Sequence, residues 1–343
     1  MNTKRIVLLC LAVVLVYAGI TLYGDVSRLR GLLSRYAWWT FFASLGLAAA
    51  NYALRFLKWQ YYLRLLHVRG VPWTESLAIF LSGFVMSITP AKAGEVFKSA
   101  LLASAHGVPI ARSAPIVVAD RLTDLVSLIA LVALGGMYFP GGLVPALVAS
   151  ALVVGLMVFV FVPALGEWAI GVVEGFAFGR NLGPRLREAY LSLRLLASPR
   201  ALLVPTALSV VAWACECAAL WLIVRGLGGG ATLAVSSFVY ATATVAGAVA
   251  MLPGGLGGTE VTMITLLQRL TAGAVTETAA SAATLLVRVA TLWFAVGVGA
   301  VALVVFRRRY DRHRDEALPP PEEAPGGEAA QRAEASRMGP EAL

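Results

Sequence analysis

Charged side chains are scarce in this sequence: only 14% of its 343 residues are Asp, Glu, Lys or Arg, whereas 59% are hydrophobic. A soluble domain carries about a quarter charged residues and about half apolar ones. The shortage of charge therefore excludes a single soluble core as the first interpretation. The charge that is present is unbalanced, with a formal net charge of +9.

Cysteine and histidine are also rare, which leaves little material for a metal centre. The three cysteines, Cys10, Cys215 and Cys217, lie in apolar stretches, and no C-x-x-C pair is present. The three histidines are scattered along the chain. Because metal sites need clustered ligands, we expect no metal site and no cofactor. The cysteines are interpreted as small buried apolar residues.

Catalytic motifs are missing as well. The sequence contains neither a G-x-S-x-G nucleophile motif nor a Walker nucleotide-binding motif. An intramembrane serine protease would need a histidine inside the membrane, and a lipid-linked glycosyltransferase would need an acidic outer loop. Neither feature is found, so we expect that the chain is not an enzyme and has no catalytic residues.

The positive excess lies within the hydrophobic part of the chain, since residues 1–306 carry 21 basic and 11 acidic residues. Basic residues that flank or interrupt apolar runs are typical of membrane topology signals or of contacts with anionic lipid. We therefore expect a membrane partner and no nucleic-acid partner.

Long apolar runs predict an all-α integral membrane protein, because a membrane-spanning helix needs about 20 mostly apolar residues. Six stretches of the sequence meet this requirement: 6–23, 39–57, 115–138, 144–162, 201–224 and 279–306. The first is interpreted as an uncleaved anchor rather than a signal peptide. The arginine-rich residues 163–200 predict an amphipathic segment at the interface. The expected organisation is a membrane domain over 1–310 and a disordered cytoplasmic tail over 311–343.

Two further apolar elements are interrupted by proline and glycine. One break lies between the apolar halves 77–89 and 96–105, and the other between 236–252 and 261–270. Because the halves of the first element are too short to cross a membrane, we predict two re-entrant broken-helix hairpins beside six full spans. Eight full spans remain the alternative. The predicted break and hinge residues are Pro90, Gly94, Pro253, Gly254, Gly255 and Gly257.

The two broken elements match each other, which indicates an internal repeat of about 77–138 and 236–306. Glu95 precedes Arg121 by 26 residues, and Glu260 precedes Arg288 by 28. With the N-terminus in the cytoplasm, three spans separate the breaks, so the repeats would be inverted. That orientation places 17 Lys and Arg on the cytoplasmic side and five outside, which satisfies the positive-inside rule and puts both termini in the cytoplasm.

Paired breaks of this kind point to the binding site of a secondary transporter, and the start of a half-helix offers free N–H groups to an anion. The candidate residues for binding a lipid headgroup are Lys92, Glu95, Lys98, Asp120, Arg121, Asp124, Glu260 and Arg288. Ionisable residues are costly in a membrane and usually functional there. The lysines and arginines would bind an anionic or zwitterionic headgroup, with arginine giving bidentate contacts to phosphate.

The acidic members of this set would orient those cations or pair with a cationic headgroup. Asp120 and Asp124 are four residues apart and share one helix face. The alternative interpretation is that the charges pair only with one another and lock helices together. Glu216, alone in its span, fits either interpretation.

Three motifs resemble those of the lysylphosphatidylglycerol synthase transmembrane region family: P-A-K-A-G-E at 90–95, D-R-L-T-D at 120–124 and L-P-G-G-L-G-G-T-E at 252–260. Asp120 stands where the family pattern has glutamate. The resemblance covers about residues 5–306, the flippase-like domain that is also found at the N-terminus of bacterial multiple peptide resistance factors. It implies a multi-pass protein of the bacterial inner membrane.

The resemblance also implies a function, namely translocation of a lipid with a polar headgroup. Phospholipids such as aminoacylated phosphatidylglycerol, lipid-linked glycans and hopanoids are the candidate substrates. The alternative is a non-transporting membrane partner that presents lipid to a separate synthase or glycosyltransferase. The sequence has no aminoacyl-transferase domain, so we do not expect it to synthesise lysylphosphatidylglycerol itself.

Overall fold

The computed structural model of the protein describes residues 31–88, 95–137, 139, 144–175, 182–250 and 253–317. Every regular element within these ranges is a helix, and they contain no strand, as the apolar runs predicted. The predicted first span, the break residues Pro90, Lys92 and Gly94, and the chain beyond residue 317 lie outside the described residues.

Within the described residues, three helical stretches are long and apolar enough to cross a membrane: α8 (Val144–Phe161), α11 (Pro199–Gly226) and Glu277–Arg308. The last stretch combines α14 (Glu277–Arg288), the π-helical turn η4 (Val289–Trp293) and most of α15 (Phe294–Ala317). Helices α3 (Trp38–Leu65) and α7 (Pro115–Gly136) also exceed the required length, but charged side chains interrupt their apolar sequence. The protein is therefore built as a multi-pass membrane protein.

The first broken element consists of two short helical pieces. Helix α4 (Trp73–Ser82) continues into the 3-10 helix η1 (Gly83–Ile88), and after the break the chain resumes as α5 (Phe97–His106). The ten residues of α5 extend about 15 Å, half of a hydrocarbon core of about 30 Å. The short helix α6 (Ile110–Ser113) then leads into α7.

The second broken element consists of α12 (Leu233–Val249), the 3-10 turn η3 (Pro253–Gly255) and α13 (Gly258–Leu270). The interruption predicted from Pro253 onwards is present. Gly254 and Gly257 have φ angles of 62° and 88°, which lie in the left-handed region that side chains disfavour. These glycines let the chain turn sharply between the two helical pieces.

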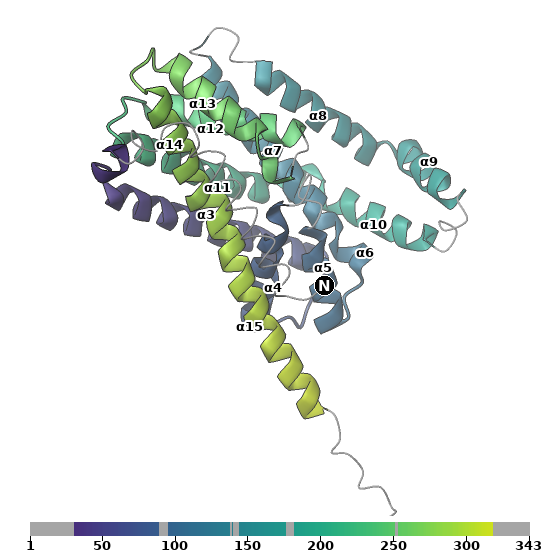
Figure 1. Cartoon of the computed structure of the whole chain (residues 1–343). Coiled ribbons are helices and arrows are strands. Elements are labelled where there is room, and N and C mark those ends of the chain that lie inside the picture. Colours follow the sequence, from purple (N-terminus) through teal and green to yellow (C-terminus); the bar gives the residue numbers. More distant parts are fainter. Residues whose placement is uncertain are drawn as a thin grey trace, which may run out of the picture.

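The helices pack so that the described ends of the two broken elements meet. Helices α3 and α11 lie side by side (Figure 1), and Ser44 Oγ of α3 donates to the Ala219 carbonyl of α11 at 3.2 Å. Helix α7 packs on α12, while α15 packs on α4 and η1. The 3-10 turns η1 and η3, one from each broken element, are in contact with each other.

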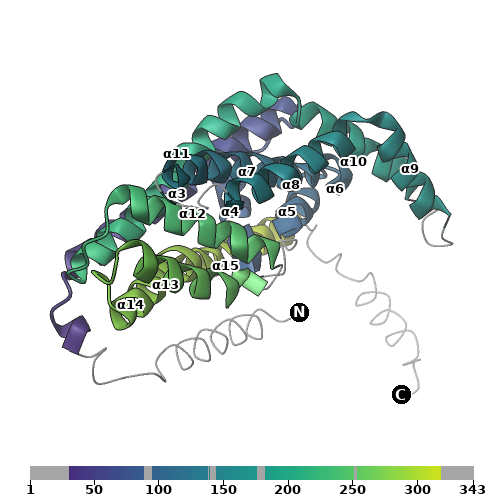
Figure 2. The ribbon, with the colours of Figure 1, turned by 90° about the horizontal axis from the view of Figure 1, so that it is seen from above.

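The helices α8, α9 (Pro163–Glu174) and α10 (Gly183–Leu196) extend to one side of the bundle in both views (Figures 1 and 2). Large apolar side chains there are exposed, among them Leu147 and Trp168, as expected of a surface that faces lipid. Arg187 of α10 forms ion pairs with Glu167 and Glu174 of α9, which ties these two helices together.

Candidate functional site

The candidate site begins with two cations of α3 that face two carboxylates of α7. The Arg55 guanidinium lies 2.9 Å from Asp120 and 3.2 Å from Asp124. The Lys58 ammonium lies 2.6 Å and 2.9 Å from the same two carboxylates. Asp120 and Asp124 thus lie on the same face of α7, as their spacing predicted. Ser209 of α11 also donates to Asp124, at 3.1 Å.

The residues of the first break join this cluster through Arg121. The Arg121 guanidinium donates to both carboxylate oxygens of Glu95 at 3.2 Å and to Asp120 at 2.8 Å. Glu95 also pairs with Lys98 at 3.3 Å. The Lys98 ammonium lies over the ring of Phe80, 5.3 Å from its centroid. The acid of the first break therefore contacts the arginine of the following span.

Counting only groups joined by direct ion pairs, the described cluster holds one more cation than it holds carboxylates; Glu216 of the cavity wall, which also acts electrostatically on Arg55, lies outside this count. The members of the cluster are Arg55, Lys58, Lys98 and Arg121 against Glu95, Asp120 and Asp124. The side chain of Arg121 is 24% exposed, whereas each of the other six is at most 11% exposed. Its Nε is buried without a hydrogen-bond partner. Arg121 is therefore the most accessible charge of a buried cluster with a positive excess.

The second break repeats the acid–arginine contact in a simpler form. The Arg288 Nε lies 2.7 Å from Glu260, and its Nη2 donates to the Gly254 carbonyl at 2.6 Å. Glu260 in turn accepts the backbone N–H of Gly257 at 2.6 Å. The start of α13, where the sequence predicted free N–H groups for an anion, is thus capped by a carboxylate of the same helix.

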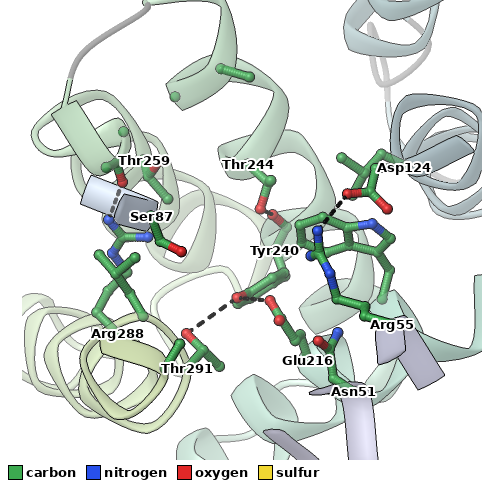
Figure 3. Close-up of a pocket in the computed structure, with 18 of the residues that line it drawn as sticks. Asn51, Arg55, Ser87, Asp124, Glu216, Tyr240, Thr244, Thr259, Arg288 and Thr291 are labelled. Atoms are coloured by element: carbon green, nitrogen blue, oxygen red, sulfur yellow. Dashed lines mark hydrogen bonds and ion pairs between the residues drawn. The ribbon is translucent and has the colours of Figure 1, made fainter. Parts of the chain in front are cut away.

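A cavity of about 320 Å³ lies where the two broken elements and the arginine-bearing helices meet (Figure 3). Ser87 of η1 lines it from the first break, and Gly254 and Gly255 of η3 line it from the second. Its charged lining residues are Arg55, Glu95, Arg121, Asp124, Glu216 and Arg288. Three arginines and three carboxylates therefore face one space.

The remaining predicted residues support this lining rather than belong to it. Lys98, Asp120 and Glu260 each form an ion pair with a charged residue of the cavity wall. Gly257 donates its N–H to Glu260. Lys92, the remaining predicted cation, lies outside the described residues.

Arg55 and Lys58 were not predicted as site residues, since both belong to the 17 basic residues that the sequence assigned to the cytoplasmic side. Lys58 has no exposed surface, so it belongs to the buried cluster instead. A usable signal was present, because Arg55 and Lys58 are three residues apart and can face carboxylates spaced by four. Glu216, left open between two interpretations, lines the cavity.

The fold and the cavity define a multi-pass helical membrane protein with ionisable residues gathered at two broken helices. The chain belongs to the family described as lysylphosphatidylglycerol synthase TM region, whose model matches residues 7–299. The resemblance noted in its motifs is thereby confirmed.

A curated relative is similar over part of the chain. It is a "UPF0104 membrane protein" of Methanothermobacter thermautotrophicus, 27% identical over 146 residues, which are 40% of this chain and 42% of the relative. The match thus spans less than half of the relative's length. No solved structure matches the chain.

Proposed function

We propose that this chain is a lipid flippase that moves a polar headgroup between leaflets through the cavity between its two broken helices. The observation that carries the proposal is the positive excess of the buried cluster together with the exposure of Arg121 to that cavity. An unmatched positive charge is costly inside a membrane protein. A phosphate group at Arg121 would offset it.

The lining of the cavity supports a headgroup rather than a whole lipid as its occupant. A volume of about 320 Å³ lies at the lower end of the range for small-molecule pockets. Polar and charged residues share the wall with apolar ones such as Leu128 and Leu292. The acyl chains would remain outside the cavity, along the exposed apolar surface of the helices.

The packing also supports an inverted repeat as part of this proposal. Helix α7, which carries Arg121, packs on α12, the first half-helix of the other unit, and α15, which follows Arg288 in the continuous stretch Glu277–Arg308, packs on α4. Such reciprocal packing is expected when two units are related by a pseudo-two-fold axis. Six full spans and two re-entrant hairpins fit this arrangement.

The proposed setting is the bacterial inner membrane, with both termini in the cytoplasm. Of the 17 basic residues assigned to the cytoplasmic side, only Arg55 and Lys58 lie in the buried cluster. The remainder still outnumber the five outer ones, so the positive-inside argument keeps its direction. We propose no chemical step for the chain.

The test is leaflet translocation by the purified chain reconstituted into vesicles with fluorescent phospholipids. Arg121→Gln should slow translocation by about tenfold or more, since it removes a charge-assisted contact with phosphate. Arg187→Gln is the matched control, because it removes an arginine that is paired with two carboxylates at the surface. Its rate should stay within about twofold of the unmodified protein.

Two results would overturn the proposal. Equal rates for Arg121→Gln and the unmodified chain would remove the assigned role of the cluster. No translocation by the chain alone, together with stoichiometric co-purification of a lipid-modifying enzyme, would favour the presentation of lipid to that enzyme.

A further inference from the structure

One region of the cavity wall contains hydrogen-bond acceptors and aromatic rings. It is formed by Asn51 and Tyr52 of α3, Trp213 and Glu216 of α11, and Tyr240 of α12. We call these five residues the acceptor subsite. Asn51, Glu216 and Tyr240 lie beside one another in Figure 3. All five are at most 8% exposed, so the subsite is inside the protein rather than at its rim.

Glu216 is held in place from the α12 side. The Tyr240 hydroxyl donates to the Glu216 carboxylate at 2.5 Å and also lies 3.4 Å from the Thr291 hydroxyl. The Tyr52 hydroxyl donates to the Thr291 carbonyl at 2.7 Å. Both tyrosines are thus anchored at the π-helical turn η4, and π-helical turns are frequent at functional sites.

The side-chain oxygen of Asn51 is a hydrogen-bond acceptor with no donor beside it. Its Nδ2 donates to the Ala212 carbonyl at 2.8 Å, which fixes the orientation of the amide. Its Oδ1 is buried without a hydrogen-bond partner, and only 1% of the residue is exposed. A buried acceptor left unsatisfied costs free energy. A bound group with N–H donors would satisfy it.

The aromatic rings of the acceptor subsite indicate that the bound group is an organic cation. The Tyr52 ring packs against Phe84 with centroids 5.0 Å apart, and the Trp213 ring lies 6.4 Å from that of Tyr240. The cation–π contacts found in the described chain involve other rings. Aromatic faces beside a carboxylate are the usual recognition surface for alkylammonium groups.

We propose that the acceptor subsite binds the ammonium group of a zwitterionic phospholipid headgroup whose phosphate lies at Arg121. This inference rests on the proposed function, because it assigns the headgroup class to the same cavity. Glu216 supplies the opposing charge, Asn51 supplies the second acceptor, and the three rings enclose the alkyl carbons. Arg55 is paired with Asp120 at 2.9 Å and with Asp124 at 3.2 Å.

A small inorganic cation fits the subsite less well. Such an ion binds through several oxygen ligands at short range, whereas three of the five residues here present aromatic rings. The other two arginines of the cavity, Arg121 and Arg288, form ion pairs with Glu95 and Glu260 respectively.

The experiment compares two short-chain lipids binding to the full chain in nanodiscs. Dihexanoyl phosphatidylethanolamine carries phosphate and ammonium, whereas dihexanoyl phosphatidylglycerol carries phosphate alone. Glu216→Gln should weaken the first by about tenfold and the second by less than about twofold. Arg121→Gln should weaken both. Glu167→Gln, on the exposed α9–α10 surface, is the matched control and should change neither.

Competition on the unmodified chain does not depend on any variant folding. Tetramethylammonium chloride should displace the phosphatidylethanolamine probe more strongly than sodium chloride does at equal ionic strength. Equal displacement by the two salts would overturn the proposal, as would equal effects of Glu216→Gln on both lipids. Tyr240→Phe, which keeps the ring and removes the hydroxyl that holds Glu216, should weaken the phosphatidylethanolamine probe selectively.

Translocation rates separate this inference from the function on which it rests. If the unmodified chain binds the two lipids as expected but moves neither, the flippase proposal fails and the subsite stands. If it moves both at equal rates and Glu216→Gln changes neither binding nor rate, the flippase proposal stands and the subsite fails.

Discussion

Each predicted charge that the structure describes has an ion-pair partner, which fits the view that such residues lock helices together. Pairing and binding are compatible, however, because the cluster around Asp120 and Asp124 keeps a positive excess after every carboxylate is paired. At the scale of the residue, the informative quantity is therefore the charge balance of the cluster, not the presence of pairs.

That balance predicts different costs for two substitutions at one ion pair. Asp124→Asn would leave four cations facing two carboxylates, while Lys58→Met would leave three facing three. Removing one partner of a buried pair costs about 3–5 kcal/mol when a charge is left uncompensated. We expect Asp124→Asn to reach that range and Lys58→Met to stay well below it, measured by SDS-induced unfolding in mixed micelles.

Arg187→Ala provides the reference for this comparison, because its ion pairs are at the surface and should contribute at most about 1 kcal/mol. If Asp124→Asn and Lys58→Met have equal effects, the charge balance of the cluster does not determine its stability.

The sequence placed Glu95 and Glu260 at a repeated spacing before Arg121 and Arg288, with which they pair in the structure, but it did not predict the partners of Arg55 and Lys58. Those partners depend on the packing of α3 against α7, and a basic helix end with aromatic neighbours is equally typical of a membrane interface. Only the tertiary contact between two helices distant in sequence distinguishes these cases.

At the scale of the element, the sequence predicted most helix ends but not all of them. Apolar runs and Pro/Gly interruptions located the helical segments to within a few residues at most ends. The ends of α3 and α15 were less predictable, since both continue beyond the apolar run as amphipathic helix. A helix does not have to end where its apolar sequence ends.

Adding a single methyl group at Gly257 should destabilise the tip of the second broken element. Gly257 has φ 88° and ψ −61°, and a side chain in such a region costs about 1–3 kcal/mol. Gly257→Ala should therefore destabilise the protein by this amount and accelerate hydrogen exchange in the peptide that covers 253–260. Mass spectrometry of exchanged peptides measures the second effect.

Gly297→Ala is the matched control within α15, where an added Cβ would meet nothing within 4 Å. It should be neutral or stabilise the helix by at most about 1 kcal/mol. Equal exchange rates at 253–260 in both variants would show that the left-handed turn is not required for the tip.

At the scale of the whole molecule, the contact between η1 and η3 bears on how the broken elements lie in the membrane. If each broken element were two full spans entering from opposite sides, the two breaks would lie at opposite faces of a core about 30 Å thick. Instead, η1, which precedes the first break, contacts η3 of the second break, which favours two re-entrant hairpins that meet near the middle.

Cysteine labelling of intact cells tests this arrangement. In a chain without its three native cysteines, Gly230→Cys in the α11–α12 loop should react with an impermeant maleimide from outside, and Arg69→Cys in the α3–α4 loop only after permeabilisation. Leu256→Cys, at the tip between η3 and α13, should react slowly under both conditions if the tip ends within the membrane, because it is only partly exposed. Rapid labelling of Leu256→Cys only after permeabilisation would place the tip in the cytoplasm and favour two full spans over a re-entrant hairpin in the second broken element. Labelling of Arg69→Cys from outside would reverse the orientation inferred from the basic residues.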